Sequence, residues 1–232
     1  MSARESGSIT SFSNNTFSNN TKAGLNISAK HVGALDEFSN YNVNNGENFI
    51  NVEAATITNA QTWKKTSAPI LFNDYSTIEA AITVNPGANI QFEASAGITI
   101  ENSGSFSAVG TSSEPINLSG RFASAGYWRG ISFRTNNPNN QLNYVNISDG
   151  GQYWGNSYSG VHLNSNGRLE MNNTSITNSN SWGMYVNASC TVICGGATQT
   201  DAAGVLSYNT IMSNGAGPDA NCSSGGCTVF FD

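Results

Sequence analysis

Four residues near the middle of the chain carry side chains used in acid–base chemistry on polysaccharides. They are Arg134, Asp149, His162 and Arg168. A polysaccharide lyase needs a base such as Arg, Lys, His or Tyr, together with acidic residues that bind Ca²⁺. A glycoside hydrolase instead needs two carboxylates across a groove. If the protein is an enzyme, Asp149, His162 and Arg168 are the catalytic candidates, and Ca²⁺ is required only for a lyase.

These residues also have simpler interpretations. Asp149 ends an apolar-Ser/Thr-Asn/Asp pattern that recurs at Asn178, so it fits a corner of the chain. His162 takes an outward strand position equivalent to those of Ser132 and Tyr185, which indicates a plain surface residue. We therefore assign no catalytic residue and expect no metal site.

An aromatic segment interrupts the sequence pattern after Asp149. Roughly six extra residues are inserted within Gly151–Ser159, and insertions in solenoids often form binding loops. The aromatic residues in this segment and just before the glycines of neighbouring repeats are Tyr153, Trp154, Tyr158, Trp128 and Trp182. Because aromatic faces stack on sugar rings, these five are the candidate ligand-binding residues, and a polysaccharide or cell-surface glycan is the expected ligand. The alternative is that Trp128 packs at a corner and the loop buries its own aromatic side chains.

The four cysteines lie near the C-terminus, at Cys190, Cys194, Cys222 and Cys227. In an extended segment Cys190 and Cys194 are roughly 13 Å apart and cannot bridge. Pairing of Cys190 with Cys222 and of Cys194 with Cys227 would span about one repeat, and Cys222–Cys227 is the competing local pair. A zinc site has looser spacing than known motifs. Disulfides predict an oxidising, extracytoplasmic location.

The composition is polar but poor in charge. Of 232 residues, 9 are Lys or Arg and 15 are Asp or Glu, which gives a net charge of −6 and 10% charged residues. Coiled coils need more Glu, Lys and Leu, and nucleic-acid binding needs a basic surface. The sequence has no apolar run of the roughly 18 residues that span a membrane. Aromatic residues, at 10%, argue against a disordered chain.

Two short patterns recur along the chain. Gly followed by apolar, polar and apolar residues begins at Gly24, Gly97, Gly130, Gly160 and Gly183. An apolar residue followed by Ser or Thr and then Asn or Asp begins at Phe17, Ile57, Ile147 and Ile176, with a weaker copy at Ile211 that is out of step by about one residue. Such periodicity predicts a solenoid, and the alternation within each copy predicts short strands. The expected fold is all-β, a coil of parallel strands with roughly eight to ten rungs, in which Asn, Ser and Thr avoid the repulsion of stacked like charges.

Several segments also resemble a known family. They are Asn85–Phe92, Val109–Ile116, Trp128–Phe133, Leu142–Ile147 and Asp149–Gly151. These segments are similar to the right-handed parallel β-helix modules of secreted and cell-surface bacterial proteins, the pectate-lyase-like superfold. The resemblance covers most of residues 9–186. It implies a right-handed, single-stranded parallel β-helix at an extracellular or cell-surface location, on a scaffold shared by lyases, hydrolases, adhesins and inert stalks.

The sequence thus predicts one β-helix domain over residues 9–232 with a cysteine-containing C-terminal end, after a start or expression remnant at residues 1–8. The expected function is non-enzymatic, as an adhesion or glycan-binding module with no nucleic-acid partner and no membrane span. The alternative is a lyase or hydrolase acting on an extracellular polysaccharide. Ice binding by a flat polar face is a third interpretation, but the outward residues form no regular Thr array, being Asn26, Thr99, Ser132, His162 and Tyr185. The oligomeric state is not predicted.

Overall fold

The chain folds into three long sheets and one short one. The computed structural model describes residues 2–3, 9, 12–152, 158–212 and 229–231. Sheet A has the order β1 (Ser2–Ala3), β3 (Asn26–Ser28), β5 (Ile50–Glu53), β8 (Ile70–Phe72), β11 (Asn89–Phe92), β14 (Ile116–Gly120), β17 (Val145–Ser148), β20 (Ser175–Thr177), β24 (Thr210–Met212). Sheet B contains β6 (Thr56–Ile57), β9 (Tyr75–Ile78), β12 (Gly97–Ile100), β15 (Ile131–Phe133), β18 (Ser159–Leu163), β21 (Trp182–Val186), β25 (Val229–Phe231). Sheet C contains β7 (Gln61–Trp63), β10 (Ala81–Val84), β13 (Ser105–Val109), β16 (Gln141–Asn143), β19 (Arg168–Asn172), β22 (Thr191–Cys194), β23 (Ala197–Gln199), and the short sheet pairs β2 (Thr16–Ser18) with β4 (Asn40–Val43).

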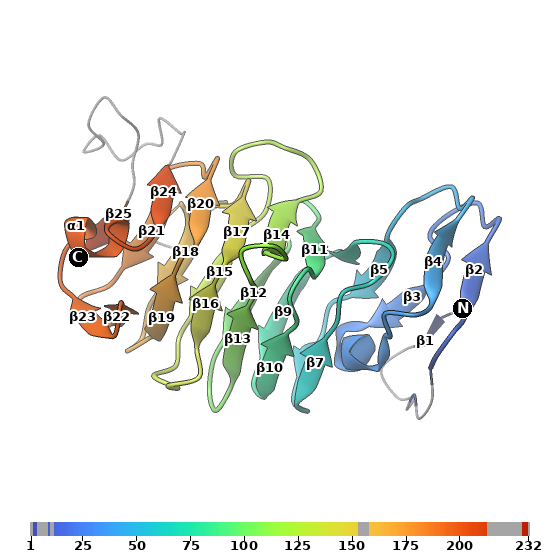
Figure 1. The fold of residues 1–232 in the computed structure, drawn as a ribbon, viewed down its shortest axis with the longest axis horizontal. Coiled ribbons are helices and arrows are strands. Elements are labelled where there is room, and N and C mark those ends of the chain that lie inside the picture. The colour runs from blue at the N-terminus through green and yellow to red at the C-terminus, as the bar shows by residue number, and fades with distance from the viewer. Residues whose placement is uncertain (1, 4–8, 10–11, 153–157, 213–228, 232) are drawn as a thin grey trace.

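Successive strands enter the three long sheets in rotation. From β6 to β22 the chain passes from sheet B to sheet C to sheet A and then returns to sheet B. Each strand from β6 to β19 pairs in parallel with the strand three positions later, so the strands lie side by side along the long axis of the molecule (Figure 1). Within the described residues, the antiparallel pairing is that of β22 with β23. The prediction of an all-β fold built on parallel strands is confirmed.

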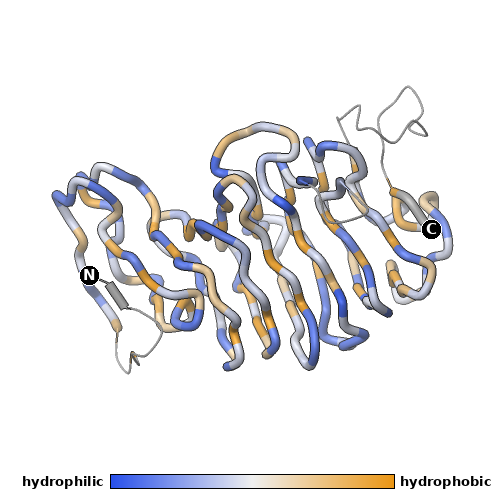
Figure 2. Tube along the Cα trace, turned by 180° about the vertical axis from the view of Figure 1, so that it is seen from behind, coloured by the Kyte–Doolittle hydropathy of each residue, from blue (hydrophilic) through white to orange (hydrophobic). Residues whose placement is uncertain are grey.

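The core consists of apolar side chains stacked in register from strand to strand. One column in sheet A contains Ile70, Ile90, Leu118, Ile147, Ile176 and Ile211, each at most 2% exposed. Hydrophobic and hydrophilic residues alternate along the strands because successive side chains point to opposite faces (Figure 2). Ile211 is in register with Ile176, so the apolar position of this weaker copy stacks like the others, while Ser213 and Asn214, which carry the offset, lie outside the described residues.

The two sequence patterns do not each map onto one sheet. Gly97, Gly130, Gly160 and Gly183 lie at or directly before the starts of sheet B strands: Gly97 begins β12, Gly130 precedes β15, and Gly160 and Gly183 are the second residues of β18 and β21. Gly24 instead precedes β3 of sheet A. Likewise Ile147 and Ile176 lie in sheet A, but Ile57 lies in sheet B and Phe17 in the short sheet. The copies of one pattern lie in different sheets because every strand with one buried face shows the same alternation, whichever sheet it joins.

The glycines before the sheet B strands allow close packing. A Cβ atom on Gly160 would lie 2.8 Å from Ser179 Oγ, and one on Gly130 would lie 2.3 Å from the carbonyl oxygen of Gly160. Gly130 also has a φ of 98°, which side-chain-bearing residues rarely adopt. This pattern therefore marks a steric requirement.

Asparagine residues occupy many corners of the chain and form hydrogen bonds between neighbouring strands. Most of the non-glycine residues with positive φ are Asn, and Asp149 and Asn178 are among the corner residues, with φ of 68° and 53°. Asn side chains on neighbouring strands also bond to each other, as from Asn51 to Asn26 at 2.7 Å and from Asn146 to Asn117 at 3.0 Å. The abundance of Asn thus follows from the architecture.

Aromatic rings form a second stack inside the fold. Phe72 and Phe92 are in register and stack with ring centroids 5.6 Å apart. Gly120 follows Phe92 in register and has no side chain, which leaves room for Trp128 to stack on Phe92 at 4.1 Å. The indole Nε1 of Trp128 donates to the carbonyl oxygen of Ser148 at 2.7 Å.

Short helices lie near both ends of the fold. The 3₁₀ helix η1 (Ala29–Ala34) packs against β6 and β7, the first strands of sheets B and C, and α1 (Ala202–Leu206) packs near β22 and β25. At the start of the chain, β1 pairs in parallel with β3. An edge strand such as β3 has unpaired backbone groups that can accept another strand, so Ser2–Ala3 contacts sheet A although the predicted domain begins at residue 9.

We expect Trp128→Ala to lower the free energy of unfolding by about 3–5 kcal/mol, because the change empties a fully buried site and removes the bond to Ser148. Urea unfolding monitored by circular dichroism measures this loss. Phe122→Ala is the control: Phe122 is 58% exposed, and its removal should cost less than about 1 kcal/mol. Equal losses in the two variants would contradict the structural role of Trp128.

Candidate functional site

A groove of about 350 Å³ lies beside the first strands of sheet A. Its lining combines carboxylates, cations, amides and one aromatic ring: Lys22, Ala23, Asn26, Glu47, Phe49, Asn51, Asn73, Glu93 and Arg121. These residues come from segments far apart in the sequence, which the stacking of β3, β5, β8, β11 and β14 brings together. We call this hollow the Arg121 groove.

The strand register places an acid beside a base in this groove. Glu93 directly follows β11 and Arg121 directly follows β14, while Phe92 and Gly120 are paired residues of these strands. The backbone N–H of Arg121 donates to the carbonyl oxygen of Phe92 at 2.9 Å, which continues the pairing past the strand end. The Arg121 guanidinium forms an ion pair with Glu93. Opposite charges on neighbouring strands attract, so the pair stabilises this register.

Two aromatic rings lie close to the Arg121 guanidinium. Its central carbon lies 4.6 Å from the ring centroid of Phe49 and 5.4 Å from that of Phe122. Phe122 contacts Tyr127 edge to face at 5.6 Å, and the Tyr127 hydroxyl donates to Glu93 at 2.7 Å. Since the charge of Arg121 is held by both an acid and two π-faces, its orientation is fixed before any ligand arrives.

The ion pair and the Tyr127 hydrogen bond also shift two pKa values. Burial alone would raise the pKa of Glu93, but hydrogen bonds from Tyr127 and Arg121 outweigh it, so this pKa lies below its usual value. Burial and the neighbouring Glu93 carboxylate raise the pKa of Tyr127. Glu93 is therefore ionised and Tyr127 is protonated over the neutral pH range.

Amide side chains continue the groove along sheet A. Asn51 donates to Asn26 at 2.7 Å, and Asn26 donates in turn to Glu53 at 2.7 Å. Lys22 and Asn73 are exposed at the edges of the groove. The groove therefore offers several hydrogen-bond donors and acceptors beside the ring of Phe49, which suits a ligand with many hydroxyl groups.

The predicted aromatic ligand face is only partly within the described structure. Trp128 is 0% exposed, so the expectation that it contacts a ligand is wrong; Gly120 makes room for its ring inside the core. Trp182 is 7% exposed, and Tyr158 is half-buried. Tyr153 and Trp154 lie outside the described residues. The alternative, in which Trp128 packs as a structural residue, is confirmed.

The three catalytic candidates come from three different sheets. Asp149 follows β17 of sheet A, His162 lies in β18 of sheet B, and Arg168 begins β19 of sheet C. Asp149 accepts hydrogen bonds from Ser148 at 2.8 Å and Asn178 at 2.6 Å, as a corner residue does. Arg168 donates to the carbonyl oxygen of Pro138 at 2.8 Å. The described contacts of Asp149 and Arg168 are thus structural.

His162 is not the surface residue that its position in the sequence indicates. It is 3% exposed and lies edge to face with Tyr185 at 5.5 Å, although its in-register neighbours Ser132 and Tyr185 mark an outward column. Burial lowers the pKa of His162, and the charge of Arg134 acts in the same direction. The expectation failed because an outward strand position is exposed only where nothing lies over the sheet.

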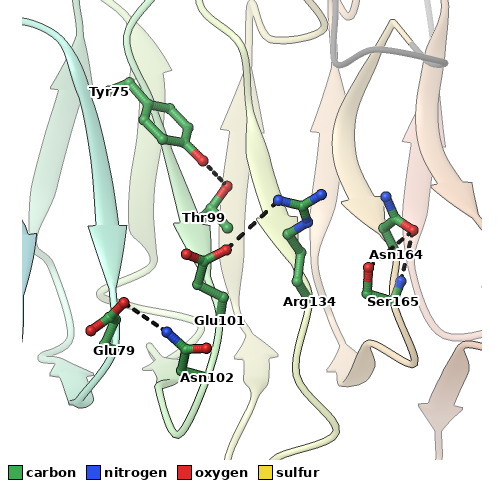
Figure 3. A network of polar contacts seen from close by, with 8 residues as sticks. All are labelled: Tyr75, Glu79, Thr99, Glu101, Asn102, Arg134, Asn164 and Ser165. Carbon is green, nitrogen blue, oxygen red and sulfur yellow. Dashed lines mark hydrogen bonds and ion pairs between the residues drawn. The ribbon is translucent and has the colours of Figure 1, made fainter.

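Polar contacts near the ends of the sheet B strands also bind neighbouring rungs together. Arg134 Nη1 lies 3.7 Å from Glu101 Oε2, Asn102 donates to Glu79 at 2.7 Å, and Tyr75 donates to Thr99 (Figure 3). Arg134 points toward Glu101 on the preceding sheet B rung, so it also has a described structural partner.

Two of the four cysteines, Cys190 and Cys194, lie within the described residues. Cys190 and Cys194 form no disulfide within the described residues, and burial raises the pKa of both thiols. Cys222 and Cys227 lie outside the described residues, so their pairing stays a prediction.

The described segments contain neither a candidate metal site nor a candidate membrane-spanning helix. Within them, no group of three or more His, Cys, Asp or Glu side chains is placed to hold a metal ion. In the same segments, no helix has the length and apolar character needed to cross a membrane.

Comparison with known proteins gives no relative for this chain: no protein-family model, curated protein or solved structure matches it.

The sequence interpretation missed the Arg121 groove. One signal was available, because the segment between Gly120 and Gly130 is longer than a tight turn and contains Arg121, Phe122 and Tyr127. The pairing of Glu93 with Arg121 was not visible, since the two are 28 residues apart and their approach depends on the exact strand register.

We expect Glu93→Gln to change the acid end of the stability profile. Because the folded-state pKa of Glu93 is lowered, its contribution is present above the unfolded-state pKa of about 4.3 and is lost as the pH falls through the folded value. The difference in Tm between the native protein and Glu93→Gln should therefore be largest near neutral pH and shrink in acid. Thermal scans between pH 3 and pH 7 measure it. A difference independent of pH would contradict this role, and Glu114→Gln, at an exposed ion pair, is the control.

Proposed function

We propose that the three long sheets form a right-handed parallel β-helix, and that this β-helix is an extracellular or cell-surface module that binds glycans. The rotation of strands through sheets B, C and A and their parallel in-register stacking support the fold. The right hand follows from the strong preference of crossovers between parallel strands. An experimental structure with left-handed crossovers between successive rungs would contradict the fold proposal.

The observation that carries the glycan proposal is the Arg121 groove. The groove contains an oriented guanidinium, the ring of Phe49 and the amide side chains of Asn26, Asn51 and Asn73. The exposed ring of Phe122 lies next to the same guanidinium. Sugar rings present C–H faces to aromatic rings and hydroxyl groups to charged and amide side chains. The groove replaces the aromatic segment near Trp128 as the preferred site, because Trp128 is buried.

The charges of the groove favour a hydroxyl-rich ligand over a highly charged one. The cations Lys22 and Arg121 are balanced by the carboxylates Glu47 and Glu93. Arg121 and Glu93 already neutralise each other, so a ligand gains mainly from hydrogen bonds and stacking. A glycan with free hydroxyl groups fits this balance.

We expect Arg121→Gln and Phe122→Ala each to weaken glycan binding by about tenfold or more, since each removes a charge-assisted hydrogen bond or a stacking surface. A glycan array identifies the ligand, and titration of the best binder measures the change. Arg134→Gln is the matched control, because Arg134 is also a partly exposed arginine paired with a glutamate but lies near sheet B.

The array has two outcomes that would overturn the proposal. The first is that no glycan binds the native protein. The second is that Arg121→Gln and Phe122→Ala bind as the native protein does; if Trp154→Ala with Tyr158→Ala alone then loses binding, the site is the aromatic loop instead.

The proposed location also makes a testable prediction. When the full chain is exported to an oxidising compartment, we expect cysteines to be joined as Cys190–Cys222 and Cys194–Cys227, or locally as Cys222–Cys227. Peptide mapping by mass spectrometry without reductant distinguishes these pairings. Four free thiols in the exported protein would contradict the disulfide prediction.

A further inference from the structure

A second hollow, of about 470 Å³, lies at the other side of the N-terminal rungs and has a different chemical character. It is lined by η1 and by the start of sheet C, and its charged or ionisable residues are Lys30, His31 and Lys64. The ten residues that line it include no carboxylate. Two of the nine Lys and Arg residues of this acidic chain, Lys30 and Lys64, thus line the same hollow. We call it the η1 hollow.

The walls of the η1 hollow are fixed by hydrogen bonds. Gln61 donates to the carbonyl oxygens of Ala29 and Lys30 at 3.1 and 2.9 Å, and its own oxygen accepts from the backbone N–H of Gly33 at 2.8 Å. A Cβ on Gly33 would lie 2.9 Å from Gln61 Cβ, so η1 and β7 are in close contact here. The hollow is therefore formed before a ligand binds.

Lys64 provides a cation held in place without a carboxylate. Its Nζ donates to the carbonyl oxygens of Gly33 and Leu35 at 3.2 and 2.9 Å. An ammonium group has three donors, so one remains after these two bonds. Within the described part of the chain, no carboxylate oxygen forms an ion pair with Lys64.

His31 also lines the hollow. Its Nε2 is buried and has no hydrogen-bond partner within the described structure, so this atom is enclosed by the protein and is not counted among the ligand-binding groups. Asn59 and Thr62 add neutral polar groups to the lining.

We propose that the η1 hollow is an oxyanion site that binds a sulfate or phosphate group, either as the free ion or as an ester on a larger molecule. Lys64 supplies a charge-assisted hydrogen bond through its remaining donor, and none of the ten described lining residues is a carboxylate that would repel the anion. The site is separate from the Arg121 groove, where cations and carboxylates balance.

Titration calorimetry of the full chain with sodium sulfate and sodium phosphate, at constant ionic strength set by sodium chloride, tests this proposal. We expect saturable binding of at least one oxyanion, and binding about tenfold weaker in Lys64→Gln. Lys65→Gln is the matched control, because Lys65 is the next residue in the chain and carries the same charge, but forms an exposed ion pair with Glu114. A sulfated or phosphorylated sugar in a parallel titration separates an ester from the free ion.

A second variant guards against a general loss of structure. Lys64→Gln also removes the bonds to Gly33 and Leu35, whereas Asn59→Asp places a negative charge in the lining and leaves those bonds intact. We expect Asn59→Asp to weaken oxyanion binding at an unchanged Tm. The proposal is overturned if neither oxyanion binds saturably, or if Lys65→Gln weakens binding as much as Lys64→Gln and Asn59→Asp do, which would indicate nonspecific screening.

Discussion

The in-register pairing of parallel strands is the constraint on which the rest of this structure depends. The backbone hydrogen bonds between paired strands place equivalent strand positions next to one another, so a buried residue must stack on a buried residue. Ile70, Ile90 and Leu118 satisfy this rule in sheet A, and Phe72 and Phe92 satisfy it with aromatic rings. The same rule disfavours stacked like charges on the surface. A sequence with 10% charged residues and many Asn side chains is the result.

The places where the stacking rule is broken are the informative ones. Gly120 interrupts an apolar column, and the vacancy above Phe92 is filled by Trp128 from the following loop. Directly beyond Gly120, Arg121 stands next to Glu93, where opposite charges make neighbouring ionised groups favourable. The same loop carries Phe122, whose ring lies near the Arg121 guanidinium, and Tyr127, whose hydroxyl donates to Glu93. The packing of Trp128 in the core and the contacts around the Glu93–Arg121 ion pair therefore involve one loop.

Much of the architecture could be predicted from sequence because it depends on local patterns. Alternation within short segments identified parallel strands, and positive φ at Asp149 and Asn178 follows from the tolerance of these residue types for that conformation. The patterns that begin at Gly24 and Ile57 lie in different sheets from the other copies, since alternation does not specify which sheet a strand joins. The site was missed because Glu93 and Arg121 meet only through register. Burial of His162 depends on what covers its sheet, which the local pattern does not encode.

The 3₁₀ helix η1 has a consequence for assembly. Within the described residues, β6 and β7 each have one edge that no other strand of their sheet occupies. Such edges are templates on which another chain can add a strand. Here η1 packs against both strands, Gln61 donates to the carbonyl oxygens of Ala29 and Lys30, and Lys64 donates to those of Gly33 and Leu35. The helix therefore hinders the addition of a strand from another copy of the chain at this end of the two sheets.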